Sequence, residues 1–392
     1  MPSRRDLLAS AGTALTVGVA GCSHDGYDDA ADAAGDATDW PMAAHDRQHT
    51  RYIPDGSGPT AGVTGRWSVP VGLASAPPVV AGDTVLAALG ADLVAFDAES
   101  GERRWSVAPD NEGASYWASP AVADGTAYVA GDERVRAFDV ASGDQLWGRS
   151  FDEPTTASPT LGYENRGVFV AAGETVLRLD EKTGETEWSR EVFGRIRQSI
   201  AVAPPFAVAV SDGGDVYAFG SDSGDGFWQV ALPSRSECMP TIVGETTYVG
   251  CFDGRLYAIN ELGERVWRTD IGGFAKGGIG VADGTVYADG GRELHALSTD
   301  GGDRRWQVGL GTTGDHPPVV VDETVYVGGD RLRALKPGGG VGLGSLRVEA
   351  ARFTADLGGP VGAMAAADGS LYAHVGPGPS DEEGRLARLD PA

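Results

Sequence analysis

The chain has 392 residues, with 56 acidic side chains against 31 basic ones, a net charge of −25 and only three lysines. Such a surface repels itself at ordinary salt, but at molar salt the Debye length falls to about 3 Å, so the composition indicates adaptation to extreme salinity, as in a haloarchaeon. The charge balance excludes a nucleic-acid-binding role, because phosphates require a basic footprint.

Residues 1–21 are predicted to form a cleaved export signal. Arg4 and Arg5 precede an apolar run that ends at Cys22 and is too short to remain as a membrane-spanning helix. The arginine pair resembles a twin-arginine signal, and Val19-Ala20-Gly21-Cys22 resembles a lipobox, in which Cys22 becomes the lipidated first residue. The alternative is an accidental apolar start with a buried cysteine. We expect an exported protein, lipid-anchored on the outer face of the cytoplasmic membrane.

Residues 22–39 hold small and acidic side chains with almost nothing to bury. They are predicted to form a disordered tether between the lipid and the folded part. The folded domain is therefore expected to span residues 40–392, beginning at Trp40-Pro41-Met42.

A unit of about forty residues recurs along the domain. In residues 119–147, short alternating runs end at turn residues such as Asp124-Gly125 and Ser142-Gly143, which is typical of antiparallel strands joined by tight turns. Each unit closes on a tryptophan, and the gaps between these tryptophans are 38 to 42 residues. The markers are Trp67, Trp105, Trp147, Trp188, Trp228, Trp267 and Trp306. Four strands per forty-residue repeat predict an all-β protein, a β-propeller with one blade per unit.

The chain ends are predicted to share a blade. Three C-terminal runs, Val361–Ala367, Ser370–Val375 and Arg385–Asp390, have no closing tryptophan, whereas Trp67 has no strands before it. Joining them closes the ring with an N-terminal strand and leaves no open edge. With seven whole units this gives eight four-stranded antiparallel blades. Seven is the alternative, because unit 317–357 is irregular and must use Phe353 in place of tryptophan.

Two cysteines flank a predicted hairpin. A two-residue turn at Gly244-Glu245 pairs position 243 with 246, so Cys238 falls opposite Cys251 at a non-hydrogen-bonded position, where Cα atoms are about 4.5 Å apart. Since an exported protein resides where disulfides persist, we expect a Cys238–Cys251 disulfide. The alternative is a pair of small buried thiols, and the lack of a nearby histidine argues against a metal site.

The repeat carries a recognisable motif. AFDAESGERRW (95–105), AFDVASGDQLW (137–147), RLDEKTGETEW (178–188) and three further copies resemble the A-x-D-x-x-T-G-x-x-x-W docking motif of pyrroloquinoline-quinone-like (PQQ-like) propeller repeats. WPMAAHDRQHTRY, from Trp40, also resembles the segment that often precedes the first blade in that family. Physically, the glycine makes the turn between strands C and D, and the tryptophan packs on the next blade.

The resemblance implies two functional classes. The family includes PQQ-dependent dehydrogenases, generally longer, with a calcium site and a vicinal disulfide, and non-enzymatic lipoproteins similar to the propeller of the bacterial outer-membrane β-barrel assembly machinery. This chain has short regular blades and no adjacent cysteines. We therefore expect a monomeric, non-catalytic cell-surface lipoprotein that binds a protein or another extracellular ligand, with no cofactor, no catalytic residue and no metal. The alternative is a small PQQ-dependent dehydrogenase.

A binding site is expected at one mouth of the channel, on the loops that lead from strand D of one blade to strand A of the next. Three consecutive loops carry Arg195, Arg197, Arg235 and Lys276, and an earlier loop carries Asp110, Glu112 and Trp117. Two interpretations stay open: a pocket for an anion or a charged partner segment, or solvated charges paired with one another. Under the dehydrogenase alternative the four cations would hold the carboxylates of PQQ, Trp117 would stack on its ring, and Asp110 and Glu112 would bind calcium.

Overall fold

The computed structural model describes residues 39–392 except 72–75, 110–114, 344–345, 349 and 379–382. The predicted signal peptide, Cys22 and the tether up to residue 38 lie outside the described residues, as do Asp110 and Glu112. In the described part, no helix is long and apolar enough to cross a membrane.

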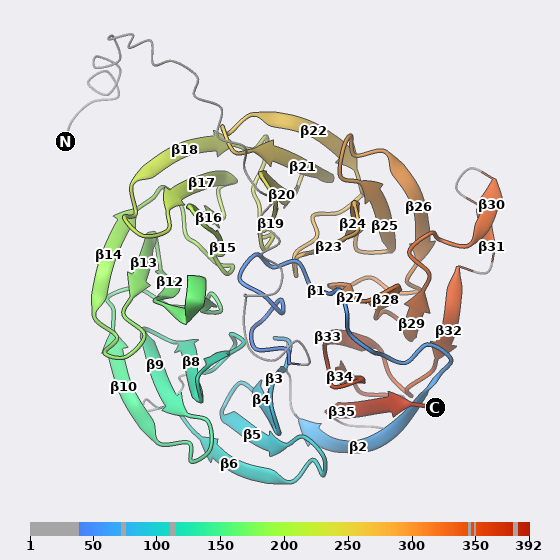
Figure 1. Cartoon of the computed structure of the whole chain (residues 1–392), viewed down its shortest axis with the longest axis horizontal. Coiled ribbons are helices and arrows are strands. Elements are labelled where there is room, and N and C mark those ends of the chain that lie inside the picture. Colours follow the sequence, from blue (N-terminus) through green and yellow to red (C-terminus); the bar gives the residue numbers. More distant parts are fainter. Residues whose placement is uncertain (1–38, 72–75, 110–114, 344–345, 349, 379–382) are drawn as a thin grey trace. The chain divides into compact units, whose positions relative to one another are not determined.

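The folded unit is a ring of eight blades, each a four-stranded antiparallel sheet (Figure 1). Within blades 1 to 7, strands A to D run from the channel outward in chain order, whereas in blade 8 the outermost strand D comes from the N-terminal side of the chain. Blade 1 contains β3 Val79–Ala81, β4 Thr84–Ala88, β5 Leu93–Asp97 and β6 Arg103–Val107, and blade 2 contains β7 Ala121–Ala123, β8 Thr126–Gly131, β9 Arg134–Asp139 and β10 Gln145–Ser150. Blade 3 contains β11 Thr160–Leu161, β12 Val168–Ala172, β13 Thr175–Leu179 and β14 Thr186–Glu191, and blade 4 contains β15 Ala201–Ala203, β16 Phe206–Val210, β17 Asp215–Gly220 and β18 Gly226–Ala231. A short 3-10 turn, η1 Tyr163–Asn165, joins β11 to β12.

Blades 5 to 8 repeat the pattern, with two additions in blade 7. Blade 5 contains β19 Thr241–Val243, β20 Thr246–Cys251, β21 Arg255–Asn260 and β22 Arg265–Asp270, and blade 6 contains β23 Ile279–Ala282, β24 Thr285–Asp289, β25 Glu293–Ser298 and β26 Arg304–Gly309. Blade 7 contains β27 Val319–Val321, β28 Thr324–Val327, β29 Leu332–Leu335 and β32 Ala351–Ala355, and blade 8 contains β33 Val361–Ala367, β34 Ser370–Val375, β35 Gly384–Pro391 and β2 Val63–Val71. In blade 7, β1 Tyr52–Ile53 adds a parallel strand beside β27, and the hairpin of β30 Val341–Leu343 and β31 Leu346–Val348 precedes β32.

The core lies between the blades. Strands A to C are almost wholly buried because both faces contact a neighbouring blade, whereas the outer strand D alternates between exposed and half-buried residues. This explains why strands A to C read as short runs of Val, Ala and Tyr, while strand D is polar apart from its tryptophan.

The prediction of eight blades with a shared closing blade is confirmed. β2 from the N-terminal side pairs antiparallel with β35 from the C-terminal end, and β35 also pairs with β34. Phe353 occupies the position opposite Ala334 that Trp306 occupies opposite Ala296 one blade earlier, so the irregular unit is a complete blade. The seven-blade alternative is therefore wrong.

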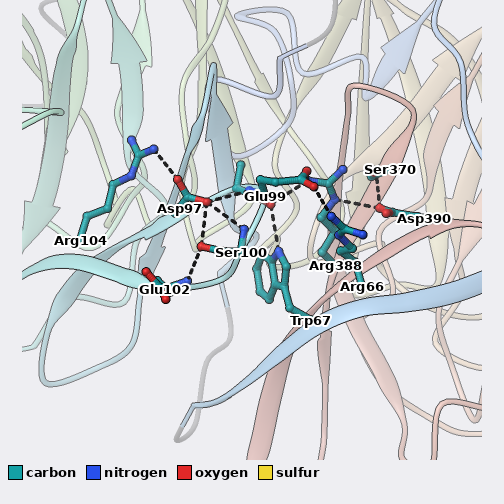
Figure 2. Close-up of polar contacts among 11 residues, drawn as sticks. Arg66, Trp67, Asp97, Glu99, Ser100, Glu102, Arg104, Ser370, Arg388 and Asp390 are labelled. Atoms are coloured by element: carbon teal, nitrogen blue, oxygen red, sulfur yellow. Dashed lines mark hydrogen bonds and ion pairs between the residues drawn. The ribbon is translucent and has the colours of Figure 1, made fainter.

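The recurrent motif fastens each blade to the one before it, and Figure 2 shows this contact at the ring closure. Trp67 of blade 8 donates its Nε1–H to the Ala98 carbonyl in the turn of blade 1, at 2.9 Å. Asp97 stabilises that turn by accepting the Ser100 N–H at 2.8 Å and an Arg104 guanidinium hydrogen bond at 2.7 Å. Gly101 lies against the indole, so a Cβ there would come within 2.7 Å of Trp67.

The same glycine–tryptophan contact recurs at all seven tryptophans of the repeat. The pairs are Gly101/Trp67, Gly143/Trp105, Gly184/Trp147, Gly224/Trp188, Gly263/Trp228, Gly302/Trp267 and Gly339/Trp306. Blade 8 has no turn between its strands C and D, because β35 and β2 come from opposite parts of the chain. Residue 353 of blade 7, which faces blade 8, therefore has no turn carbonyl to which an indole N–H could donate. A phenylalanine, which has no donor, fits this position.

Candidate functional site

Residues 40–53, here called the channel segment, run through the centre of the ring (dark blue in Figure 1). Their carbonyls accept hydrogen bonds from the innermost strands of five blades, at 2.7 to 2.9 Å. The donor and acceptor pairs are Val122/Pro41, Val202/Arg47, Ile242/Gln48, Val281/Thr50 and Val320/Arg51, and Trp40 exchanges two bonds with Val80 of a sixth blade. The segment therefore fills the channel at the level of the A strands.

The channel segment is held in an irregular shape by its own side chains. Asp46 accepts the Thr50 N–H at 3.0 Å, and the Thr50 hydroxyl also donates to Asp46. His49 lies between blades, with Nδ1 at 2.9 Å from the Pro240 carbonyl and Nε2 at 3.2 Å from the Thr160 hydroxyl. His49 and Arg51 have positive φ angles of 64° and 55°, a conformation that side chains adopt only where the surroundings enforce it.

Above the segment, where the A strands begin, lies a cavity of about 450 Å³, here called the mouth cavity. Every connection or strand start that leads into a blade contributes to its wall, and the channel segment contributes to its floor. The lining residues are Ala43, Arg51, Ala76, Pro77, Trp117, Ala118, Thr156, Ser158, Arg197, Gln198, Met239, Lys276, Gly277, Asp315, Pro317, Gly362 and Ala363. Its volume is within the range of small-molecule and peptide side-chain pockets.

Three of the predicted site residues meet in this cavity. Trp117 is 51% exposed and packs over Gly90, whose backbone exchanges two hydrogen bonds with Tyr116. Arg197 is held by an ion pair of 3.1 Å from its Nε to Asp212. Lys276 is exposed; its carbonyl accepts the Met239 N–H at 3.4 Å, and among the described residues its ammonium forms no hydrogen bond or ion pair.

Two predicted cations lie outside the wall of the mouth cavity. Arg195 is within 3.7 Å of Glu153, and Arg235 stacks on the ring of Phe252 at 4.7 Å. Each of the two hypotheses therefore describes part of the arrangement. Arg197 and Lys276 line the cavity, as an anion pocket would require, whereas Arg195 is paired with Glu153 of a neighbouring loop.

Arg51 is a charged group of the cavity that the sequence analysis missed. Its side chain is 1% exposed, and its Nη2 donates to the Gly277 carbonyl at 2.6 Å. Its Nε and Nη1 are buried and have no hydrogen-bond partner in the described part of the chain. Burial lowers the pKa of the guanidinium to about 10, with Asp315 and Asp46 acting in the opposite direction, so Arg51 is still charged at neutral pH.

Asp315 is the second missed residue and the one carboxylate among the described residues of the wall. Its Oδ1 accepts the Gly277 N–H at 2.7 Å. The side chain is exposed within the cavity, yet desolvation by the surrounding ring raises its pKa, against the effect of that hydrogen bond and of Arg51 and Lys276. Extending the survey of loops to the one after Trp306 would have found Asp315, whereas Arg51 gives no periodic signal.

Neither a calcium site nor a disulfide is formed by the described residues. No three His, Cys, Asp or Glu side chains gather there as a metal site requires. The hairpin register that motivated the bridge is as predicted, with Val243 opposite Thr246, but Cys238 and Cys251 are free buried thiols. Burial raises the pKa of Cys238 to about 12. The disulfide remains a prediction for the exported protein.

Comparison with known proteins gives one family. The family model described as outer membrane protein assembly factor BamB matches residues 30–150, 131–273 and 253–392, which together cover most of the chain. A comparison with curated proteins found no match.

Solved structures of similar fold include both functional classes. BamB from Moraxella catarrhalis is 16% identical, with a TM-score of 0.63 over 84% of this chain and 98% of its own. The quinohemoprotein alcohol dehydrogenase from Comamonas testosteroni is 13% identical, with a TM-score of 0.72 over 90% of this chain and 80% of its own. A europium-containing methanol dehydrogenase is 13% identical, with a TM-score of 0.68 over 91% and 98%. At these identities the structures share the fold.

Proposed function

Because the chain belongs to the family of the outer membrane protein assembly factor BamB, we propose that it is a non-catalytic scaffold that binds a partner protein at its channel mouth. The observation that carries this proposal is the mouth cavity itself. The connections or strand starts that lead into all eight blades line it, together with Ala43 and Arg51 of the channel segment. A loop-lined cavity of this kind suits the capture of a projecting side chain or segment.

Exposed aromatic side chains on the connections that lead into the blades support a protein partner. Trp117 is 51% exposed in the cavity wall, and Phe193 is 79% exposed in the same connection as Arg197. Large exposed aromatics are typical of the anchor residues of protein interfaces. Both lie on connections between strand D and strand A, so both belong to the mouth face of the ring.

We further propose that the scaffold is exported and anchored through Cys22, as the twin-arginine and lipobox resemblances imply. Changing Cys22→Ser should release the protein into the medium, because the lipid anchor is lost. Changing Arg4 and Arg5 to lysine should retain the precursor inside the cell. An intact mass that includes residues 1–21 in the mature protein would count against this.

Site-specific photocrosslinking tests the scaffold. A photoreactive phenylalanine analogue at Phe193 should capture a partner on intact cells. The matched control is the same analogue at Leu262, which is 69% exposed in the turn between β21 and β22, on the opposite face of the ring. Equal capture at both positions, or none at Phe193, would refute a partner site at the channel mouth.

A second function is kept because Trp117, Arg197 and Lys276, all predicted to hold PQQ, do line one cavity. Bound PQQ would supply a quinone that accepts electrons from an alcohol or sugar. Arg197 and Lys276 would bind its carboxylates, and Trp117 would pack on its ring. In the described wall, however, Asp315 is the one carboxylate, so the donors expected for calcium are incomplete there.

Titration with PQQ and calcium in high salt separates the two functions. The scaffold predicts neither stoichiometric binding nor dye-linked oxidation of alcohols or sugars. Stoichiometric binding with turnover, abolished by Arg197→Ala and Lys276→Ala, would establish the dehydrogenase instead.

A further inference from the structure

The buried guanidinium of Arg51 is unusual because two of its donor nitrogens have no acceptor among the described residues. Buried donors normally find a partner, and an unsatisfied charged donor is more costly than a neutral one. In the described part of the chain only Nη2 is bonded, to the Gly277 carbonyl. Arg51 also borders the mouth cavity, where its N–H donates to the Ala44 carbonyl and its own carbonyl accepts the Val320 N–H. An acceptor from outside the chain would complete its hydrogen bonds.

A second cation faces the same space. Lys276 comes from the connection that also supplies Gly277, to which Arg51 is bonded. Among the described residues its ammonium has no ion pair, in a protein whose net charge is −25. Arg197 contributes less charge to the cavity, since Asp212 already neutralises it.

Asp315 limits the charge that the cavity can accept. Its carboxylate interacts electrostatically with both Arg51 and Lys276 and accepts a hydrogen bond from the Gly277 N–H, which fixes its orientation. Within the wall itself, two cations and one carboxylate leave one net positive charge, and Asp46 of the channel segment also acts on Arg51. Asp315 would repel a dianion such as sulfate more strongly than a monoanion, and the two oxygens of a carboxylate group suit a guanidinium.

We propose that the mouth cavity binds a carboxylate group between Arg51 and Lys276, with Asp315 selecting against more highly charged anions. The surrounding wall is mostly small and apolar, from Ala43, Ala76, Ala118 and Ala363, and accommodates the carbon body that carries the carboxylate. This inference rests on the proposed function, because it names the group by which the scaffold recognises its partner. The carboxylate belongs either to an acidic side chain of that partner or to a free small acid.

Calorimetric titration in molar KCl tests the proposal with two pairs of probes. Butyrate is compared with butyramide, and an end-blocked peptide with one Glu is compared with the same peptide carrying Gln. The acids should bind and the amides should not. Tighter binding of the peptide would identify a partner side chain as the source, and tighter binding of butyrate a free acid.

Variants locate the binding. Lys276→Gln should weaken the acid by about tenfold, as expected for one lost charge-assisted hydrogen bond. Arg235→Gln is the matched control, since Arg235 lies on the same face but outside the cavity wall, and it should change nothing. Asp315→Asn should admit sulfate. Arg51→Lys keeps the charge without the planar fork and should also weaken the acid.

The outcomes separate this inference from the scaffold. If Phe193 captures a partner but the acids bind no better than the amides, the carboxylate site is wrong and the scaffold stands. If the acids bind and Phe193 captures nothing, the scaffold fails. Equal effects of Lys276→Gln and Arg235→Gln would overturn the assignment to this cavity.

Discussion

Gly143 lies in the turn between β9 and β10, with a φ of 77°, and faces the indole of Trp105 from the preceding blade. A Cβ at this position would come within 2.8 Å of the Trp105 ring. Gly125, in the same blade, has nearly the same φ of 75°, but a Cβ there would meet nothing within 4 Å. Substitutions at these two glycines therefore distinguish the effect of backbone strain from the effect of the contact between blades.

The change Gly143→Ala should destabilise the protein more than Gly125→Ala. Both substitutions force a side chain into the left-handed region, at about 1–2 kcal/mol. At Gly143 the added methyl also displaces the indole and strains its 2.9 Å hydrogen bond to the Val140 carbonyl, and overpacking of this kind typically costs about 1–3 kcal/mol more. We expect a total loss of about 2–5 kcal/mol at Gly143.

Denaturant unfolding followed by tryptophan fluorescence, at fixed molar KCl, measures the difference. The free energy of unfolding of Gly143→Ala should lie about 1–3 kcal/mol below that of Gly125→Ala. Equal losses of unfolding free energy in the two variants would refute the reasoning. They would mean that the glycine–tryptophan contact does not contribute to stability and that the motif requires glycine only for the conformation of the turn.

Three further predictions follow from the same structure. Burial lowers the pKa of His49 and of His374 to about 4, so the folded protein binds fewer protons than the unfolded chain between pH 6.5 and 4. The free energy of unfolding should therefore fall as the pH is lowered through that window. If His374→Phe left the slope of the free energy of unfolding against pH unchanged, this prediction would be contradicted. Deleting Gly384–Pro391 removes a strand paired on both sides and should lower the melting temperature far more than deleting residues 23–38; equal melting temperatures would contradict the shared blade. The exported protein should contain a Cys238–Cys251 disulfide, worth roughly 3 kcal/mol at most, and peptide mapping that recovers both as free thiols would disprove it.

The fold could be predicted from the sequence because its repeat is local. Each blade is specified by alternation, by turn glycines and by a closing tryptophan at a fixed spacing, and the leftover strands at 361–390 could complete only the Trp67 strand. Even Phe353 was identifiable, since the register of its blade requires one large side chain at that position.

The site could be predicted only in part, because it depends on where loops converge. Arg195 and Arg197 are two residues apart, yet only Arg197 lines the cavity; Arg195 pairs with Glu153 of a neighbouring loop, whereas Arg197 pairs with Asp212. Arg51 belongs to a segment with positive φ angles and no repeating pattern, and its contacts are with residues far away in the sequence: its side chain donates to the Gly277 carbonyl and its own carbonyl accepts the Val320 N–H. Periodicity carries no information about such contacts.

The central claim is that residues 40–53 fill the channel and form the floor of the mouth cavity. Hydrogen exchange of the A strands tests it most directly, since five of their backbone amides donate to carbonyls of this segment. We expect slow exchange for peptides that contain Val122, Val202, Ile242, Val281 and Val320, and faster exchange at these amides than elsewhere in their blades when residues 40–53 are deleted. Rapid exchange of the same amides in the intact chain would show that the channel is open and would contradict this role of residues 40–53.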